Sequence, residues 1–118
     1  MTHLELSNLT EEQCTKITQG IVNDLIRALN LGNYSLIWRY FTDGCAEEIS
    51  AERFLTLRRK ITEEYQELQS AKLETTQSAN NQIEQKWVIQ TNHSKELVLK
   101  ITLVPVKEFL AIDSFHIK

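Results

Sequence analysis

Three residues of this chain have the side chains and surroundings that acid–base chemistry would need. Asp113 stands between Ile112 and Ser114 near the end of the sequence, where a carboxylate shielded from water could act as a general base. Tyr34 and Tyr40 carry hydroxyl groups that could donate a hydrogen bond to a substrate. The other interpretation of Asp113 is a carboxylate at a rim in contact with water. The catalytic residues are therefore unknown, and Asp113 is the one candidate.

The rest of the sequence argues against several classes of site. Its His, Cys, Asp and Glu residues lack the spacing of a zinc or iron site, and no glycine-rich stretch forms a phosphate loop. The 13 basic and 16 acidic residues are mixed along the chain, without a basic patch that could neutralise nucleic-acid phosphates. We therefore expect no metal, no cofactor and no nucleic-acid partner.

A pocket for a flat apolar ligand is the second kind of site that the sequence suggests. Large aromatic side chains can line such a pocket beside a few polar groups. Aromatic residues at helical spacing can also be plain core, in which case they fill the pocket themselves. The expected pocket lining consists of Tyr34, Trp38, Phe54, Trp87 and Asp113.

The first half of the chain has helical periodicity. Thr10 and Gln13 have the spacing of a capping box, and Gly32 can end the first helix in the left-handed conformation. A shorter helix follows over residues 34–41, and a third is predicted over residues 50–68. The expected core stripe of the first helix is Cys14, Ile17, Ile21, Leu25 and Leu29.

The second half of the chain has the two-residue periodicity of strands. The alternation predicts strands at about 70–78, 82–91, 95–105 and 108–117, close enough in sequence to form an antiparallel meander. The length suits one domain, residues 1–118, with a single core. The fold class is therefore α+β, with N-terminal helices packed on a curved four-stranded antiparallel sheet.

The predicted sheet carries apolar residues on both faces. Helices can cover one face, which leaves the opposite face as a candidate subunit interface. We therefore expect a homodimer that buries this face. The expected interface residues are Val88, Val98, Val104, Leu110 and Ile112.

One corner of the sequence resembles a known superfamily. The stretch from Ala28 to Phe41 reads ALNLGNYSLIWRYF, and with the order of helices and strands it resembles the nuclear transport factor 2-like superfamily. The resemblance implies that the sheet bends around the helices to form a cone. The superfamily includes ketosteroid isomerases, small dehydratases and polyketide cyclases, alongside proteins that only bind partners or assemble as dimers. Membership therefore leaves the function open.

The resemblance to the isomerases is poor at the positions that carry their chemistry. Those enzymes place a tyrosine donor on the first helix, and counting back from Gly32 this position falls near Leu25. They place a catalytic carboxylate on a strand after the second helix, where residues 42–48 of this chain are short and acidic. Here Thr42-Asp43-Gly44 favours a turn instead.

We therefore expect a non-catalytic binding or association domain that forms a homodimer and holds a small apolar ligand in the cone. The alternative is a small isomerase or hydro-lyase for an apolar substrate, with Asp113 as base and Tyr34 or Tyr40 as donor. The sequence has no signal-peptide pattern and no run approaching the ~20 apolar residues of a membrane span. A cytoplasmic protein without a membrane partner is the resulting expectation.

Overall fold

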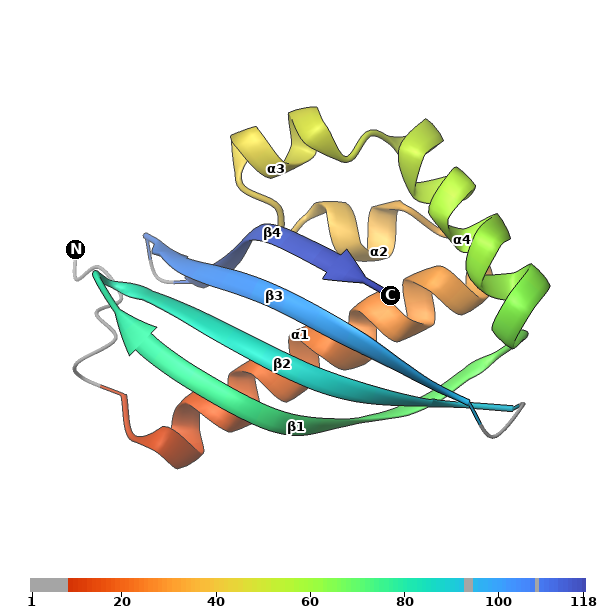
Figure 1. Cartoon of the computed structure of the whole chain (residues 1–118). Helices are drawn as coiled ribbons and strands as arrows, with labels where there is room; N and C mark the ends of the chain where they lie inside the picture. The colour runs from red at the N-terminus through yellow and green to blue at the C-terminus, as the bar shows by residue number, and fades with distance from the viewer. Residues whose placement is uncertain (1–8, 93–94, 108) are drawn as a thin grey trace.

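A computed structural model describes residues 9–92, 95–107 and 109–118 of the chain (Figure 1). Within these residues, four helices are followed by four strands. None of the described helices combines the length and the hydropathy that a membrane crossing requires. The elements are α1 (Glu11–Leu31), α2 (Ser35–Trp38), α3 (Asp43–Glu48), α4 (Ala51–Tyr65), β1 (Leu68–Ala79), β2 (Gln82–Thr91), β3 (Glu96–Val106) and β4 (Phe109–Ile117).

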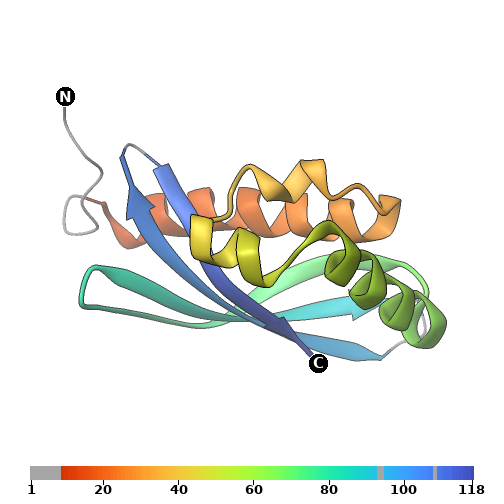
Figure 2. The same ribbon diagram turned by 90° about the horizontal axis from the view of Figure 1, so that it is seen from above.

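The strands form one antiparallel sheet in the order β1-β2-β3-β4, as the meander predicted. Figure 2 shows the sheet bending past α1, with α1 along one side of it and α3 and α4 on the side nearest the viewer. The predicted fold class, helices packed on a curved four-stranded antiparallel sheet, is confirmed.

Local capping signals set the helix boundaries. The Thr10 side chain accepts a hydrogen bond from the Gln13 backbone N–H at 3.1 Å, and the Gln13 side chain accepts one from the Thr10 N–H at 2.9 Å. Gly32 closes α1 at a φ of 66°, a conformation that costs glycine little because it has no Cβ. Ser50 caps α4, as predicted, by accepting a bond from the Arg53 N–H.

Helix α3 was not predicted. Thr42 was expected to belong to a turn, but its hydroxyl accepts a hydrogen bond from the Cys45 backbone N–H at 3.2 Å and so begins a helix. Asp43 in the first turn suits the positive end of the helix dipole. The predicted helices at 34–41 and 50–68 are correspondingly shorter in the structure.

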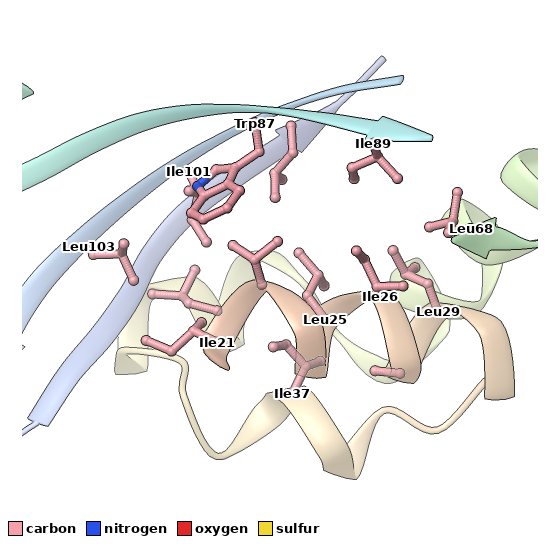
Figure 3. Close-up of a cluster of buried hydrophobic side chains, with 14 of the residues drawn as sticks. Ile21, Leu25, Ile26, Leu29, Ile37, Leu68, Trp87, Ile89, Ile101 and Leu103 are labelled. Carbon is pink, nitrogen blue, oxygen red and sulfur yellow. The ribbon is translucent and has the colours of Figure 1, made fainter. Parts of the chain in front are cut away.

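An apolar layer fills the space between α1 and the inner face of the sheet, which is the face toward α1. Trp87 and Leu99 lie opposite each other on β2 and β3, and both are fully buried. Leu25 of α1 is also fully buried. Figure 3 shows the sheet side chains and the α1 side chains pointing toward one another across this layer. Burial of each such side chain contributes about 1.5–3 kcal/mol to stability.

A buried polar contact crosses the same layer. Gln85 shares the inner face with Trp87, and its Nε2 donates to Thr18 Oγ1 of α1 at 3.2 Å. The indole Nε1 of Trp87 donates to Gln85 Oε1 at 2.9 Å. Because buried polar groups are costly unless they are hydrogen-bonded, this arrangement favours one alignment of α1 against β2.

Asn30 joins the end of α1 to the start of β1. Its Nδ2 donates to the Leu68 carbonyl at 2.8 Å, and its Oδ1 accepts from the Leu68 N–H at 2.9 Å. Arg58 of α4 donates to the carbonyls of Leu29 and Asn30 at 3.1 and 3.2 Å. These bonds satisfy main-chain groups at the helix end and at the sheet edge that would otherwise need water.

We expect Asn30→Ala to lower the free energy of unfolding by about 1–3 kcal/mol, because it leaves both Leu68 main-chain groups without their partner. Urea unfolding followed by circular dichroism measures this change. Asn23→Ala is the matched control, since Asn23 is exposed on the same helix. Equal stabilities of the two variants would contradict the role given to Asn30.

Candidate binding groove

The aromatic residues expected to line an internal pocket do not form one. Phe54 and Trp87 are fully buried in the packed core. The structure brings Tyr34 and Phe54 together, with ring centroids 5.5 Å apart, but as part of that packing. Trp38 is 54% exposed at the surface. The interior is therefore filled, and the predicted pocket lining is corrected on this point.

Asp113 is not paired with a tyrosine hydroxyl. It is exposed, and Thr42 Oγ1 donates a hydrogen bond to its Oδ1 at 3.0 Å. The Tyr34 hydroxyl donates instead to the carbonyl of Ile49. The base and the donor of the isomerase alternative thus do not meet. Asp113 is therefore a carboxylate exposed to water, which was the second of its two interpretations, and not a shielded base.

Two of the expected interface residues belong to the core. Leu110 and Ile112 are buried within the subunit, and Ile112 lies opposite the inner-face residue Leu103. The register between β3 and β4 shifts after Thr102, which leaves Asp113 as an extra residue in β4. Because such a bulge interrupts the alternation of faces, the prediction placed Leu110 and Ile112 on the wrong face.

The other three expected interface residues do lie on the outer face of the sheet, away from α1. Val88 and Val98 are direct cross-strand partners, and Val104 follows on β3. All three are half-buried in the subunit.

A groove of about 1140 Å³ lies between α1, residues 39–43 and the β3–β4 hairpin. Three of the large apolar side chains that are most exposed among the described residues gather in it. Ile17 is 38% exposed, Val106 is 42% exposed and Phe109 is 70% exposed. Ile17 had been assigned to the core stripe of the first helix, so this assignment is corrected. The apolar lining consists of Ile17, Ile21, Phe41, Val106, Phe109, Leu110 and Ala111.

Gly20 keeps part of the α1 wall of the groove free of side chains. It lines the groove, and a Cβ added there would meet no heavy atom within 4 Å.

One polar cluster lines the groove beside these apolar walls. Tyr40 Oη donates a short hydrogen bond to Asp24 Oδ2, and Arg39 Nη2 lies 3.3 Å from the same oxygen. The Arg39 guanidinium also lies 5.0 Å from the centre of the Tyr40 ring, in cation–π contact. Burial and then the bond to Asp24 raise the pKa of Tyr40 above that of an ordinary tyrosine.

Sequence reasoning missed this site because its walls come from distant parts of the chain. Tyr40 was considered as a hydrogen-bond donor, but its partner Asp24 lies on α1, 16 residues away in the sequence. The sequence did offer one signal, the apolar residues Val106 and Phe109 on either side of the predicted β3–β4 turn. Within the described part of the chain, no group of three His, Cys, Asp or Glu side chains is arranged to hold a metal ion.

No protein-family model matches the sequence, and no curated protein matches it. Solved structures do match the fold. An NTF-2 like protein of unknown function from Silicibacter pomeroyi superposes with a TM-score of 0.65 at 11% identity, over 93% of this chain and 100% of that one. The protein Aln2 from a Streptomyces species superposes with a TM-score of 0.55 at 11% identity, over 94% of each chain. The chain therefore has the nuclear transport factor 2-like fold, as its sequence suggested.

The contact between Tyr40 and Asp24 predicts a dependence of stability on alkaline pH. Because the pKa of Tyr40 is raised in the folded state, the contribution of its neutral phenol is complete below the ordinary tyrosine pKa of about 10 and is lost as the pH rises through the folded value. We expect the difference in unfolding free energy between the native chain and Tyr40→Phe to shrink from about pH 8 to about pH 11. Urea unfolding at both pH values measures it, and a constant difference would contradict the contact.

Proposed function

We propose that the protein is a non-catalytic binding domain that holds a small apolar ligand in the groove between α1 and the β3–β4 hairpin. The observation that carries the proposal is the gathering of exposed apolar side chains, Ile17, Val106 and Phe109, around a concave site of about 1140 Å³. Ligand sites in proteins are typically concave and mostly apolar, with a small number of placed polar groups. The proposed site therefore lies at the side of the cone instead of inside it.

The polar cluster suits orientation of a ligand better than proton transfer. The Tyr40 hydroxyl already donates to Asp24, so it is not free to stabilise an enolate oxygen. Arg39 contacts the same carboxylate oxygen and neutralises its charge. Asp113, the base of the isomerase alternative, is bonded to Thr42 outside the lining of the groove. These contacts support binding over catalysis.

The driving force for such binding is the removal of apolar surface from water. Each square ångström of apolar surface that a ligand covers contributes about 25 cal/mol. Phe109 has the largest exposed fraction among the large apolar side chains of the groove. The guanidinium of Arg39 and the carboxylate of Asp24 then provide a hydrogen-bond donor and an acceptor beside the apolar surface.

Gly20→Leu tests the groove, because its side chain would occupy space that is open in the native protein. The probe is N-phenyl-1-naphthylamine, a neutral dye that fluoresces more strongly in apolar surroundings. We expect saturable binding to the native protein and at least about tenfold weaker binding to the variant, which corresponds to about 1.4 kcal/mol.

Gly44→Leu is the matched control. A Cβ at Gly44 also meets nothing within 4 Å, but Gly44 lies on α3 and does not line the groove. The control should bind the dye as the native protein does. Native-like binding by Gly20→Leu, or no binding by the native protein, would refute the proposal.

Self-association through the outer face of the sheet is a second proposed function. The observation that favours it is the direct pairing of Val88 with Val98 on a face that no described helix covers. Lys86 and Glu74 on the same face form an ion pair with a separation of 3.6 Å. Burial of the valine pair against a second copy would remove its apolar surface from water.

Val98→Glu should abolish a homodimer of this kind, because it would bury an unpaired carboxylate in each half of the interface. Sedimentation velocity over a range of protein concentrations measures the association. Leu55→Glu, at an exposed position on α4, is the matched control and should leave the association unchanged. A native protein that stays monomeric throughout, or equal effects of the two substitutions, would contradict the face-to-face dimer.

A further inference from the structure

The two edge strands of the sheet, β4 and β1, differ in which of their main-chain groups other segments of the chain bond. The β4 edge is closed at Ile112 by the segment before α3, because the Thr42 N–H donates to the Ile112 carbonyl at 3.0 Å and the Ile112 N–H donates to the Tyr40 carbonyl. Phe41 forms a parallel bridge with Ile112 at the same place. At the opposite edge, β1 is the outermost strand (Figure 1).

The β1 edge is closed only at its first residue by the described part of the chain. Asn30 bonds both main-chain groups of Leu68, in the way that a neighbouring strand would. The register of β1 against β2 is irregular between Leu68 and Ala71 and again between Leu73 and Thr75. From Thr75 to Ala79 the pairing with β2 has no register shift, and no residue that the structure describes pairs with the outer side of this stretch, which is therefore a free edge.

This free edge lacks the devices that usually prevent strands from pairing with other chains. Residues 75–79 have the sequence TTQSA, with no charge and no proline, and all five side chains are exposed. Natural edges are normally protected by charged side chains, proline, bulges or a covering segment. In β1 the charged residues, Lys72 and Glu74, both precede the regular stretch.

The hairpin turn fixes which main-chain groups point outward. Asn80 and Asn81, at φ values of 54° and 56°, form a two-residue turn closed by the pair Ala79 and Gln82. The closing pair of such a hairpin directs its main-chain groups toward each other. The backbone N–H and C=O groups of successive residues point to opposite sides of a strand. Those of Ser78 and Thr76 therefore point to the free edge.

We propose that this edge pairs antiparallel with the same edge of a second copy, about a two-fold axis at Gln77, to form a continuous eight-stranded sheet. In this register Thr76 of each copy lies opposite Ser78 of the other, and these are the residues whose main-chain groups point outward. Thr75 lies opposite Ala79, and Gln77 lies opposite its own counterpart. No like charges meet, and each residue faces one on the same side of the sheet.

The small number of paired residues in this register limits the strength of the contact. Five paired residues bury much less than the about 1,200 Å² of a stable interface, so the dimer is weak and forms at high protein concentration. It uses none of the outer-face valines and none of the groove residues, so the amide signals that shift on dilution distinguish this contact from the face-to-face dimer and from the groove.

Opposite charges at Gln77 test the two-fold pairing directly. At the axis, Gln77→Lys places two ammonium groups opposite each other, and Gln77→Glu places two carboxylates there. We expect each variant alone to associate at least about fivefold more weakly than the native protein, and an equimolar mixture of the two to recover association. Sedimentation velocity from about 20 µM to about 1 mM covers the range of dissociation constants expected for so small a contact.

A second readout locates the contact. In nitrogen–proton correlation spectra, dilution of the native protein should shift the amide signals of residues 75–79, whereas shifts of the Val88 and Val98 signals report the separate face-to-face contact. Gln90→Lys, on the neighbouring strand β2, is the matched control and should associate as the native protein does. The proposal is overturned if the native protein is monomeric at about 1 mM, if both Gln77 variants associate normally, or if their mixture gains nothing over either one alone.

Discussion

The packing of α1 against the inner face of the sheet is the contact on which the other features of the molecule depend. Leu25 and Trp87 have no exposed surface, and neither does Leu99 beside them. Protein interiors reach the packing density of organic crystals, and the side chains of α1 and of the sheet meet across this layer (Figure 3). The groove, the outer face and the free sheet edge all lie around this layer instead of inside it.

Polar side chains fix the position of α1 against the sheet, and their hydrogen-bonding groups are already bonded within the fold. Asn30 bonds the first residue of β1, and Gln85 bonds both α1 and Trp87. Among the described residues, no buried polar side-chain atom lacks a hydrogen-bond partner. The hydroxyls of Tyr34 and Tyr40 are engaged as well. The hydroxyls of both tyrosines are therefore bonded within the fold.

Features set by near neighbours in the sequence could be predicted, and features set by distant contacts could not. The Thr10 cap and the Gly32 stop depend on residues within one helical turn, and strand alternation needs no knowledge of the fold. Asp113 broke that alternation through a bulge in β4, beside the place where the segment before α3 bonds to Ile112. Thr42 was ambiguous for another reason, because the same residue types favour turns and helix caps.

The groove was beyond local reasoning because it exists only once three separate segments meet. Ile17 fits the helical period of the core stripe, and only the position of the β3–β4 hairpin leaves it facing a groove. The same holds for Asp24, an ordinary surface carboxylate on a helix until Tyr40 and Arg39 approach it. Periodicity identifies the face of a helix, but not which part of that face its neighbours cover.

Gly20 is a residue that neither the stability of α1 nor the packing of the core requires. A glycine inside a helix costs about 1 kcal/mol relative to alanine. A Cβ there would meet nothing within 4 Å, so packing does not require the glycine. Exposed Ile17 and Phe109 are likewise not needed by the core, and clustered apolar surface is unusual on a protein without a partner. Because Gly20, Ile17 and Phe109, which stability does not explain, lie around one groove, this groove is a better candidate for binding than the packed interior.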